Sequence, residues 1–218
     1  MDLRNCDCMD LMKEFPDKYF ELAIVDPPYG IGESGDKNHT RGKLAEAKNY
    51  KAFSGNDLNS PDIEYFQELF RVSKNQIIFG ANHFISKIPF DSSCWIVWNK
   101  INGETDFADC ELAWTSFKSA VRKFDFKWQG MLQGDMKNKE ERVHPTQKPV
   151  ALYKWLLQNY AKAGDKILDT HLGSMSSVIA CYDEKFDITG SELDPDYFNA
   201  GMERVRKHTS QVRLDDII

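Results

Sequence analysis

The residues Asp26-Pro27-Pro28-Tyr29-Gly30 place a carboxylate, a rigid turn and an aromatic ring directly after a short apolar run. An amino group on an aromatic ring is a poor nucleophile, because its lone pair is delocalised into the ring. Two acceptors, the Asp26 carboxylate and the Pro27 carbonyl, would favour a pyramidal nitrogen and localise that lone pair. The prolines offer no competing N–H and stiffen the turn, and Tyr29 could stack on a flat ring. The set indicates transfer to an aromatic amine; the alternative is an ordinary proline turn.

A second polar group runs from Asp169 to Glu192 and has the spacing of a nucleotide-binding unit. The pattern predicts a strand at 166–169, a tight loop at 170–174, a helix at 175–182 and a strand at 187–192 that ends on an acid. Backbone N–H groups at such a helix start can bind a carboxylate or phosphate, and an acid about 20 residues later can bind ribose hydroxyls. Alone, this unit is equally consistent with a nicotinamide-dependent oxidoreductase.

The elements that must position these residues follow from apolar periodicity and turn signals. Ser60 is predicted to cap a helix with Pro61 at its first position, and Gly164 to cap the end of a helix at 150–160. A final helix is expected at 196–207, and the polar segment 31–60 is expected to be a long functional loop. Buried strands are predicted at 21–25, 76–80, 94–98 and 111–115.

The order of these elements constrains the topology. Alternating strands and helices predict a mainly parallel twisted sheet with helices on both faces. Only 26 residues follow Glu192, too few to complete a doubly wound sheet, so the missing strands must come from the N-terminal half. The fold class expected is therefore α/β, a permuted Rossmann-like fold in which the nucleotide-binding unit comes last.

Length and composition suit one domain over residues 1–218 with a short insertion at about 117–142. The start of the chain lacks the pattern of a signal peptide, and no stretch approaches the length of a membrane span. Five cysteines with irregular spacing favour a reducing compartment, and they lack the pairs of a zinc site, so no metal is expected. We expect a soluble, cytoplasmic protein without membrane partners.

The net charge of −6 is unfavourable for binding nucleic acid, but the charge is unevenly distributed. Residues 36–51 carry +3 and residues 118–148 carry +4, so two basic segments lie on an acidic body. They could form a polar binding face, or they could be two solvated surface loops. The basic residues selected as candidates for DNA binding are Lys37, Arg41, Lys43, Lys118, Arg122, Lys123 and Lys127.

The motifs in combination resemble the amino-directed DNA methyltransferases of the β class. Asp26-Pro27-Pro28-Tyr29 is similar to their catalytic signature, and its place before the cofactor loop resembles the β-class order. The resemblance covers nearly the whole chain and includes Asn5-Cys6-Asp7, Ile77-Ile78-Phe79-Gly80-Ala81-Asn82, Trp95-Ile96-Val97-Trp98-Asn99-Lys100 and His144-Pro145-Thr146-Gln147-Lys148-Pro149.

This resemblance implies S-adenosylmethionine as cofactor and a methylsulfonium as the group under attack. Asp26, Pro27, Pro28 and Tyr29 would be catalytic. The loop after Asp169 would hold the methionine part of the cofactor, and Glu192 would take both ribose hydroxyls. Asp7 would accept from the adenine amine of the cofactor. The full set expected to bind cofactor is Asp7, Cys8, Asp26, His144, Thr146, Gln147, Lys148, Asp169, Thr170, His171, Gly173, Ser174 and Glu192.

One residue departs from the family pattern. The cofactor loop of the family usually reads Gly-x-Gly, whereas Gly173-Ser174 is followed here by Met175. The Met175 side chain could crowd the cofactor, or it could point into the sheet as part of the following helix.

Aspartate in the first signature position favours N6 of adenine over N4 of cytosine, by resemblance. The base must leave the duplex to reach such a pocket, and 117–142 is the best candidate for target recognition, with 36–51 second. So short a segment predicts a brief target, loose specificity or help from a second subunit.

Several alternatives and partners stay open. They are cytosine-N4 methylation, transfer to RNA or to a protein amide, a nicotinamide-dependent oxidoreductase, which would leave Asp26 to Gly30 unexplained, and a cofactor-binding protein without turnover. By resemblance, the expected partner is DNA, and the expected origin is prokaryotic or phage. A homodimer and a paired restriction endonuclease are further possible partners.

Overall fold

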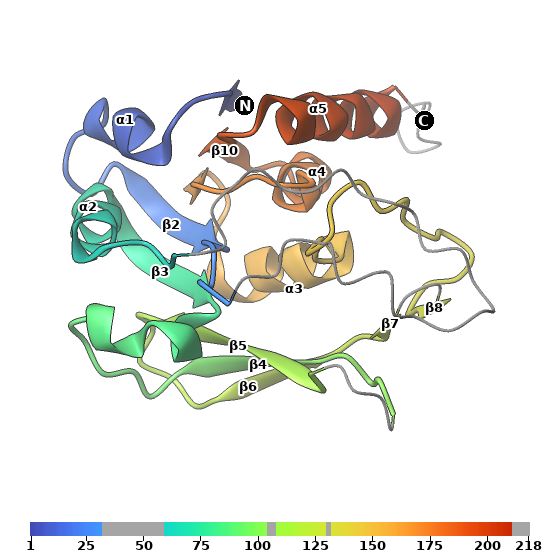
Figure 1. The fold of residues 1–218 in the computed structure, drawn as a ribbon, viewed down its shortest axis with the longest axis horizontal. Coiled ribbons are helices and arrows are strands. Elements are labelled where there is room, and N and C mark those ends of the chain that lie inside the picture. The colour runs from blue at the N-terminus through green and yellow to red at the C-terminus, as the bar shows by residue number, and fades with distance from the viewer. Residues whose placement is uncertain (32–58, 104–107, 130–131, 211–218) are drawn as a thin grey trace.

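The protein, described by a computed structural model at residues 1–31, 59–103, 108–129 and 132–210, is built around one twisted sheet (Figure 1). Within these residues the sheet has eight strands in the order β1-β10-β9-β2-β3-β5-β4-β6. A separate antiparallel pair is formed by β7 (Trp128–Gln129) and β8 (Leu132–Gln133). The strands of the main sheet are β1 (Asp2–Arg4), β2 (Phe20–Val25), β3 (Ser73–Phe79), β4 (Trp95–Asn99), β5 (Cys110–Thr115), β6 (Arg122–Asp125), β9 (Lys166–Asp169) and β10 (Asp187–Ser191).

The permuted order predicted from the chain is confirmed. β2, from the N-terminal part, pairs in parallel with β9, with Ala23 opposite Leu168. On its other side β2 pairs in parallel with β3, and β9 pairs in parallel with β10. The carboxyl ends of β2, β9 and β10 therefore meet at one edge of the sheet, which is where open α/β sheets bind their ligands.

Helices cover both faces of the sheet, as expected. Along β2, Leu22 and Ile24 join one buried cluster, whereas Ala23 and Val25 join the other, because successive side chains of a strand point to opposite faces. The first cluster includes side chains of α3, α4 and α5, and the second includes those of α1 and α2 (Figure 1). The helices are α1 (Cys8–Lys13), α2 (Ile63–Val72), α3 (Val150–Tyr160), α4 (Ser176–Glu184) and α5 (Pro195–Thr209).

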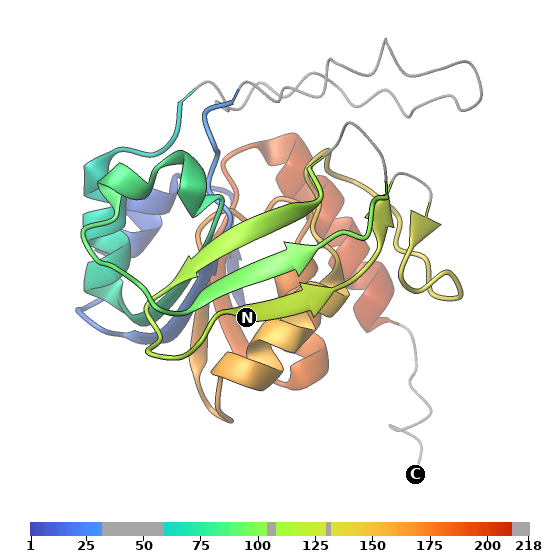
Figure 2. The same cartoon turned by 90° about the horizontal axis from the view of Figure 1, so that it is seen from below.

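One strand of the sheet runs against the rest. β5 is antiparallel to both of its neighbours, β3 and β4. Figure 2 shows β5 alongside β4, with β6 on the other side of β4. Because of this reversal, the first residues of β5 lie at the edge where β2 and β3 end. Glu111, the second residue of β5, is thereby brought to that edge.

One predicted helix start and one predicted helix cap are wrong. Helix α2 begins at Ile63 with Asp62 as its N-cap, not at Pro61 with Ser60 as the cap. Ser60 and Pro61 instead belong to a connection held by Lys87, whose Nζ donates to Ser60 Oγ at 2.9 Å and to the Pro61 carbonyl at 2.7 Å. Helix α3 spans Val150–Tyr160 as predicted, but its C-cap is Ala161, and Gly164 lies beyond it in the turn before β9 with φ +90°.

The basic segment 117–142 is only partly outside the sheet. Its residues Arg122–Asp125 form β6, the edge strand beside β4. The part that could form an insertion on the sheet is therefore 126–142, which contains β7 and β8. The two short N-terminal elements, β1 and α1, were not predicted, because three and six residues give too little periodicity to detect.

None of the helices in the described residues has the length and apolar character needed to cross a membrane.

Candidate active site at the carboxyl edge of the sheet

Asp26 follows the last residue of β2 and is the centre of a half-buried polar cluster. Its Oδ1 accepts a hydrogen bond from the Tyr29 hydroxyl at 2.8 Å. Its Oδ2 accepts from Lys148 Nζ at 2.5 Å. Lys148 belongs to the loop before α3, 122 residues away in the chain, and its side chain is only 3% exposed. Three residues of two sequence motifs are thus brought together, although Lys148 was expected to line the cofactor pocket rather than to contact Asp26.

Two further charged residues extend this cluster, and neither was selected as a site residue from the sequence. Glu111 Oε2 lies 3.1 Å from Lys148 Nζ and 3.5 Å from the Tyr29 hydroxyl. Glu111 Oε1 lies 2.5 Å from Lys100 Nζ. Positive and negative groups therefore alternate in the order Asp26, Lys148, Glu111, Lys100, which is the arrangement that burial of charge requires.

Burial and pairing shift the pKa values of this cluster in different directions. Burial raises the pKa of Asp26, although the Lys148 ammonium opposes it. Burial would also raise the pKa of Glu111, but Lys148 and Lys100 together lower it to about 2. Burial would lower the pKa of Lys148, but Asp26 and Glu111 outweigh it and raise that pKa. Glu111 is therefore firmly ionised, whereas the charge of Asp26 depends on Lys148.

The position of the Tyr29 ring is fixed by the hydrogen bond of its hydroxyl to Asp26 and by packing against His83 and Gly80. It stacks on His83 with the ring centroids 5.1 Å apart and the planes 16° from parallel. It also lies against Gly80, where an added Cβ would come within 2.1 Å of the ring. Gly80 has φ +67°, a left-handed conformation that glycine adopts without steric cost. Gly80 thus makes room for Tyr29.

We expect the substitution Gly80→Ala to lower the free energy of unfolding by about 1–3 kcal/mol, because the added methyl group both strains the backbone and displaces the Tyr29 ring. Urea denaturation measures this loss. Gly103→Ala is the matched control: Gly103 has φ +66°, but nothing lies within 4 Å of its Cβ position. Equal losses in the two variants would show that contact with Tyr29 contributes nothing.

The predicted cofactor loop lies at the ends of β9 and β10, beside Asp26. Asp169 is 1% exposed; its Oδ1 accepts from the His171 backbone N–H, and its Oδ2 accepts from the Ser177 hydroxyl. Burial raises the pKa of Asp169 to about 7 and lowers that of His171 to about 4. Thr170 is buried and its hydroxyl bonds to Tyr65 of α2 at 2.7 Å. The loop is therefore rigidly packed on both sides.

Glu192, at the end of β10, fixes the same loop. Its Oε2 accepts from the Gly173 N–H at 2.8 Å and its Oε1 from the Asp194 N–H at 3.0 Å. Asn5 links this strand end to the N-terminal segment by donating to the carbonyls of Glu192 and Leu193. Asp7 is exposed and caps α1 by accepting from the Met9 N–H, with the half-buried Cys8 directly after it.

The loop from His144 to Lys148 lies beside the cofactor loop, but its side chains make different contacts. His144 packs edge-on against Tyr197 of α5 at 4.3 Å and lies next to Gly173, and burial lowers its pKa to about 4. Thr146 is exposed and contacts His144 Nδ1. Gln147 is buried and closes the loop on itself, because its side chain bonds to the backbone of Val143 and of Glu141.

Met175, the departure from the family pattern, is the N-cap of α4 and has φ +58°. Its side chain is fully buried in the core, and its Cγ and Sδ face Gly201 of α5, where a Cβ would come within 2.7 Å. The structure therefore favours the second alternative, a side chain that points into the core. Here a methionine takes the left-handed conformation, which costs roughly 1–2 kcal/mol, and gains core packing in return.

The substitution Met175→Gly is expected to lower the free energy of unfolding by about 1–3 kcal/mol. Loss of a buried methionine costs about 2–5 kcal/mol, and relief of the left-handed strain returns roughly 1–2 kcal/mol. The urea midpoint measures the result, with Met175→Leu as the volume-matched control. Calorimetry should find little change in S-adenosylmethionine affinity; a large loss of affinity would place the side chain in the cofactor site instead.

The candidate DNA-binding residues do not lie together. Lys118 and Arg122 lie near the start of β6, which pairs with the start of β4 at the edge opposite Asp26. Lys123 is exposed and pairs with Asp125 at 3.0 Å. Lys127 follows β6 on the side where β4 ends, toward the candidate site. Lys37, Arg41 and Lys43 lie outside the described residues.

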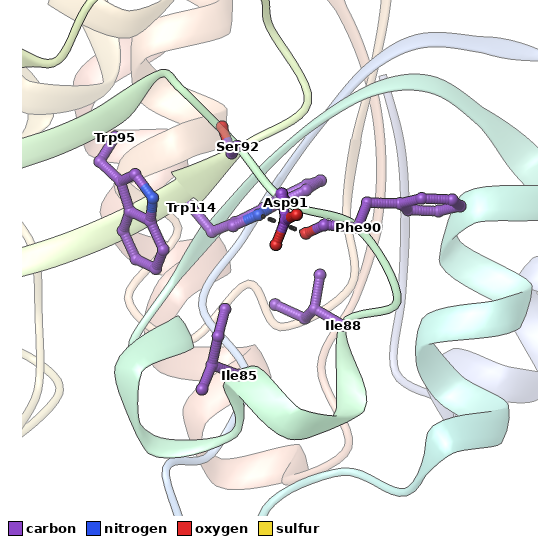
Figure 3. Close-up of a pocket in the computed structure, with 7 residues that line it drawn as sticks. All are labelled: Ile85, Ile88, Phe90, Asp91, Ser92, Trp95 and Trp114. Atoms are coloured by element: carbon purple, nitrogen blue, oxygen red, sulfur yellow. Dashed lines mark hydrogen bonds between the residues drawn. The ribbon is translucent and has the colours of Figure 1, made fainter.

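A separate pocket of about 400 Å³ lies away from Asp26, beside the paired tryptophans at the start of β4 and the end of β5 (Figure 3). The Trp114 indole N–H donates to the Phe90 carbonyl at 3.2 Å. The pocket is lined by Ile85, Ile88, Phe90, Asp91, Ser92, Trp95 and Trp114, none of which is a predicted site residue.

Four contributors to the site were missed in the sequence: Glu111, Lys100, Tyr65 and Arg204. Glu111 stands near the start of an otherwise apolar strand, a signal that could have marked it. Arg204 of α5 donates to the carbonyl of Ser174 at 2.7 Å and to Glu140 at 2.6 Å, and so links the cofactor loop to the segment 126–142. Tyr65 carries no such signal, because it belongs to the apolar face of α2.

Comparison with known proteins identifies relatives in sequence and in fold. Type II methyltransferase M.HinfI of Haemophilus influenzae is 22% identical over 241 residues, covering 92% of this chain and 67% of that protein. The crystal structure of the M1.HpyAVI–SAM complex is similar with a TM-score of 0.58 at 21% identity, over 93% of this chain and 98% of that one.

Two further structures share the fold. A Thermus thermophilus protein described as a DNA modification methylase, complexed with S-adenosyl-L-methionine, has a TM-score of 0.60 at 16% identity over 97% of each chain. The cytosine-N4-specific PvuII DNA methyltransferase has a TM-score of 0.60 at 12% identity, over 95% of this chain and 89% of that one. The family model for DNA methylases matches residues 95–203, which is half of the chain. The chain therefore belongs to the DNA methylase family.

Proposed function

We propose that this DNA methyltransferase acts on the N6 amine of adenine, in a base flipped out of the duplex, with Asp26 as the acceptor that activates the amine. The observation that carries the proposal is the place of the Asp26 carboxylate, directly after β2 and beside the strand that ends on Asp169. An aspartate in this first signature position favours adenine over cytosine, by resemblance to the β class. The amine and the methyl donor would then meet at adjacent strand ends.

The groups at the ends of β9 and β10 fit S-adenosylmethionine by their chemistry. The Asp169 carboxylate can meet the ammonium of the cofactor, and the Gly173 turn at the start of α4 can approach its carboxylate. Glu192 is held in place by two backbone N–H groups, and each of its oxygens keeps a lone pair for a ribose hydroxyl. When bound, S-adenosylmethionine supplies an electrophilic methyl group on a sulfonium sulfur, which leaves as a neutral thioether.

The residues of this chain then have four tasks in the transfer. The Asp26 carboxylate and the Pro27 carbonyl accept the two amine hydrogens and so localise the nitrogen lone pair. That lone pair forms the new N–C bond, positive charge develops on the nitrogen, and the nearby carboxylate stabilises it. One proton leaves the methylated nitrogen, with Asp26 as its first acceptor. Tyr29 offers a ring face for the flipped base.

The DNA-facing surface is proposed to include residues 126–129, with Lys127, and residues 132–142, because they lie toward the edge that holds Asp26. Trp128 binds this segment to the candidate site by donating to the Gln147 carbonyl at 2.9 Å, and Arg142 packs over the Trp128 ring at 4.6 Å. The roles of Lys118, Arg122 and Lys123 stay predictions. A homodimer and a paired restriction endonuclease also stay predictions.

The test is transfer of a labelled methyl group to PCR-amplified bacterial DNA, followed by mass spectrometry of the nucleosides, with Asp26→Ala as the negative control. N6-methyladenine is the expected product. N4-methylcytosine would contradict the proposal and favour the second candidate, which the fold shared with the PvuII cytosine-N4 enzyme keeps open. Binding of S-adenosylmethionine without transfer to any DNA would favour a binding protein without turnover.

A further inference from the structure

Both groups that hydrogen-bond to Asp26 also reach Glu111. Lys148 Nζ lies 2.5 Å from Asp26 Oδ2 and 3.1 Å from Glu111 Oε2. The Tyr29 hydroxyl lies 2.8 Å from Asp26 Oδ1 and 3.5 Å from the same Glu111 oxygen. A shift of well under one bond length in either group would therefore change its main partner from one carboxylate to the other.

The proposed function favours such a change. Each oxygen of Asp26 already accepts from another side chain, and the incoming amine would have to share it. An ammonium held against Asp26 would also cancel the negative charge that stabilises the nitrogen as it becomes positive. Asp26 works best when Lys148 keeps it ionised before the amine arrives and moves away when it does.

We propose that Glu111 is a positioning residue that takes over Lys148, and with it the Tyr29 hydroxyl, when the target amine binds to Asp26. The proposal rests on the proposed function, because it assumes that Asp26 is the acceptor for the amine. No bond is made or broken in this step; two hydrogen bonds change their acceptor. Glu111 acts through Lys148 and Tyr29 and does not itself touch the reacting atoms.

The structure equips Glu111 for this role. Its other oxygen, Oε1, is anchored by Lys100 at 2.5 Å, so the carboxylate stays in place while Lys148 moves. Lys148 and Lys100 lower the pKa of Glu111 to about 2, so its charge is always available. Its backbone is fixed in β5, where Glu111 pairs with Trp98 of β4. A rigid, ionised acceptor therefore lies beside Asp26 and shares both of its partners.

The substitution Glu111→Gln tests this role because it removes the charge and keeps the shape. We expect kcat for methyl transfer to fall about 10- to 100-fold, while the Kd values for S-adenosylmethionine and for DNA stay within about twofold. Glu111→Asp, which retains the charge, should recover part of the lost kcat. Glu68→Gln is the matched control, because Glu68 is also ion-paired and only 19% exposed, but it lies in α2 beside Arg71.

A double-mutant cycle with Lys148→Met gives the sharper test. If Glu111 acts mainly by holding Lys148, then Glu111→Gln should lower kcat by a much smaller factor when Lys148 is already methionine than in the native background. The comparison is made at a pH above the acid limb of every variant. Equal losses in both backgrounds, an unchanged kcat in the single variant, or a Glu111→Asp variant no better than Glu111→Gln would each overturn the proposal.

Failure of the proposed function gives a different result. If the Asp26→Ala variant methylates DNA as fast as the native protein, the role of Asp26 is overturned, and this inference with it. If Asp26→Ala lowers kcat but Glu111→Gln does not, this inference alone is overturned.

Discussion

Asp26→Ala is expected to lower kcat for methyl transfer by about 10²- to 10³-fold, the size of effect seen when one oriented group that stabilises transition-state charge is removed. The variant loses the acceptor for the amine and leaves the Lys148 ammonium beside the nitrogen that becomes positive. Burial increases the repulsion between the ammonium and the nitrogen, because charges interact more strongly where water is excluded. A single-turnover assay with labelled S-adenosylmethionine measures the loss.

Asp26→Asn separates the charge of Asp26 from its shape. The amide keeps one acceptor oxygen, so its kcat should lie between those of the native protein and Asp26→Ala. Loss of S-adenosylmethionine affinity should be smaller than the loss of kcat in both variants, because Asp26 is proposed to act mainly on the amine. If Kd for the cofactor rises as much as kcat falls, Asp26 is chiefly a cofactor ligand and the proposed mechanism is wrong.

Lys148→Met is expected to move the acid limb of the kcat/KM profile to higher pH by about 1–3 units, the usual effect of an adjacent opposite charge. Asp26 accepts the amine only when it is ionised. In the native protein burial already raises its pKa, and Lys148 opposes that rise. Without the ammonium the pKa of Asp26 rises further, so activity is lost earlier as the pH falls and is recovered at high pH.

The pH dependence of kcat/KM is the measurement to use, because it reports pKa values of the free enzyme. Lys148→Arg keeps the positive charge and should leave the acid limb near its native position. Lys100→Met is the matched control, because Lys100 pairs with Glu111 rather than with Asp26. The acid limb of the Lys100→Met profile should move less than that of Lys148→Met. An unmoved limb in Lys148→Met would show that Lys148 does not control the ionisation of Asp26.

Much of the candidate site was predictable because its residues stand at strand ends. Val25 is the last residue of β2 and Asp169 is the last residue of β9, and the short length remaining after Glu192 required these two strands to share a sheet. That argument predicted that Asp26 and Asp169 stand at the carboxyl edge of one parallel sheet, which the structure confirms; it also shows that β2 and β9 are direct neighbours. The helix α3 and strand β9 were predicted with their observed bounds.

Other features could not be predicted, because they depend on which segments meet in space. Lys148 was assigned to the cofactor pocket, but its side chain contacts Asp26, Tyr29 and Glu111. The Met175 side chain had two possible directions, and only the packing of α5 at Gly201 distinguishes them. The start of α2 was misplaced because Lys87, far along the chain, holds Ser60 and Pro61 in the preceding connection.

The sequence by itself determined the Asp26 signature, the nucleotide-binding unit and their permuted order, because strand ends, proline turns and chain length are local or countable properties. Only the tertiary structure decided how Asp26 is charged. The reversed strand β5 brings Glu111 and, with Lys100, completes a buried row of alternating charges around Lys148. These ion pairs depend on the distances between four separate segments and on their burial, and neither can be read from the order of residues. The signature identifies Asp26 as the acceptor, and the tertiary structure determines its ionisation.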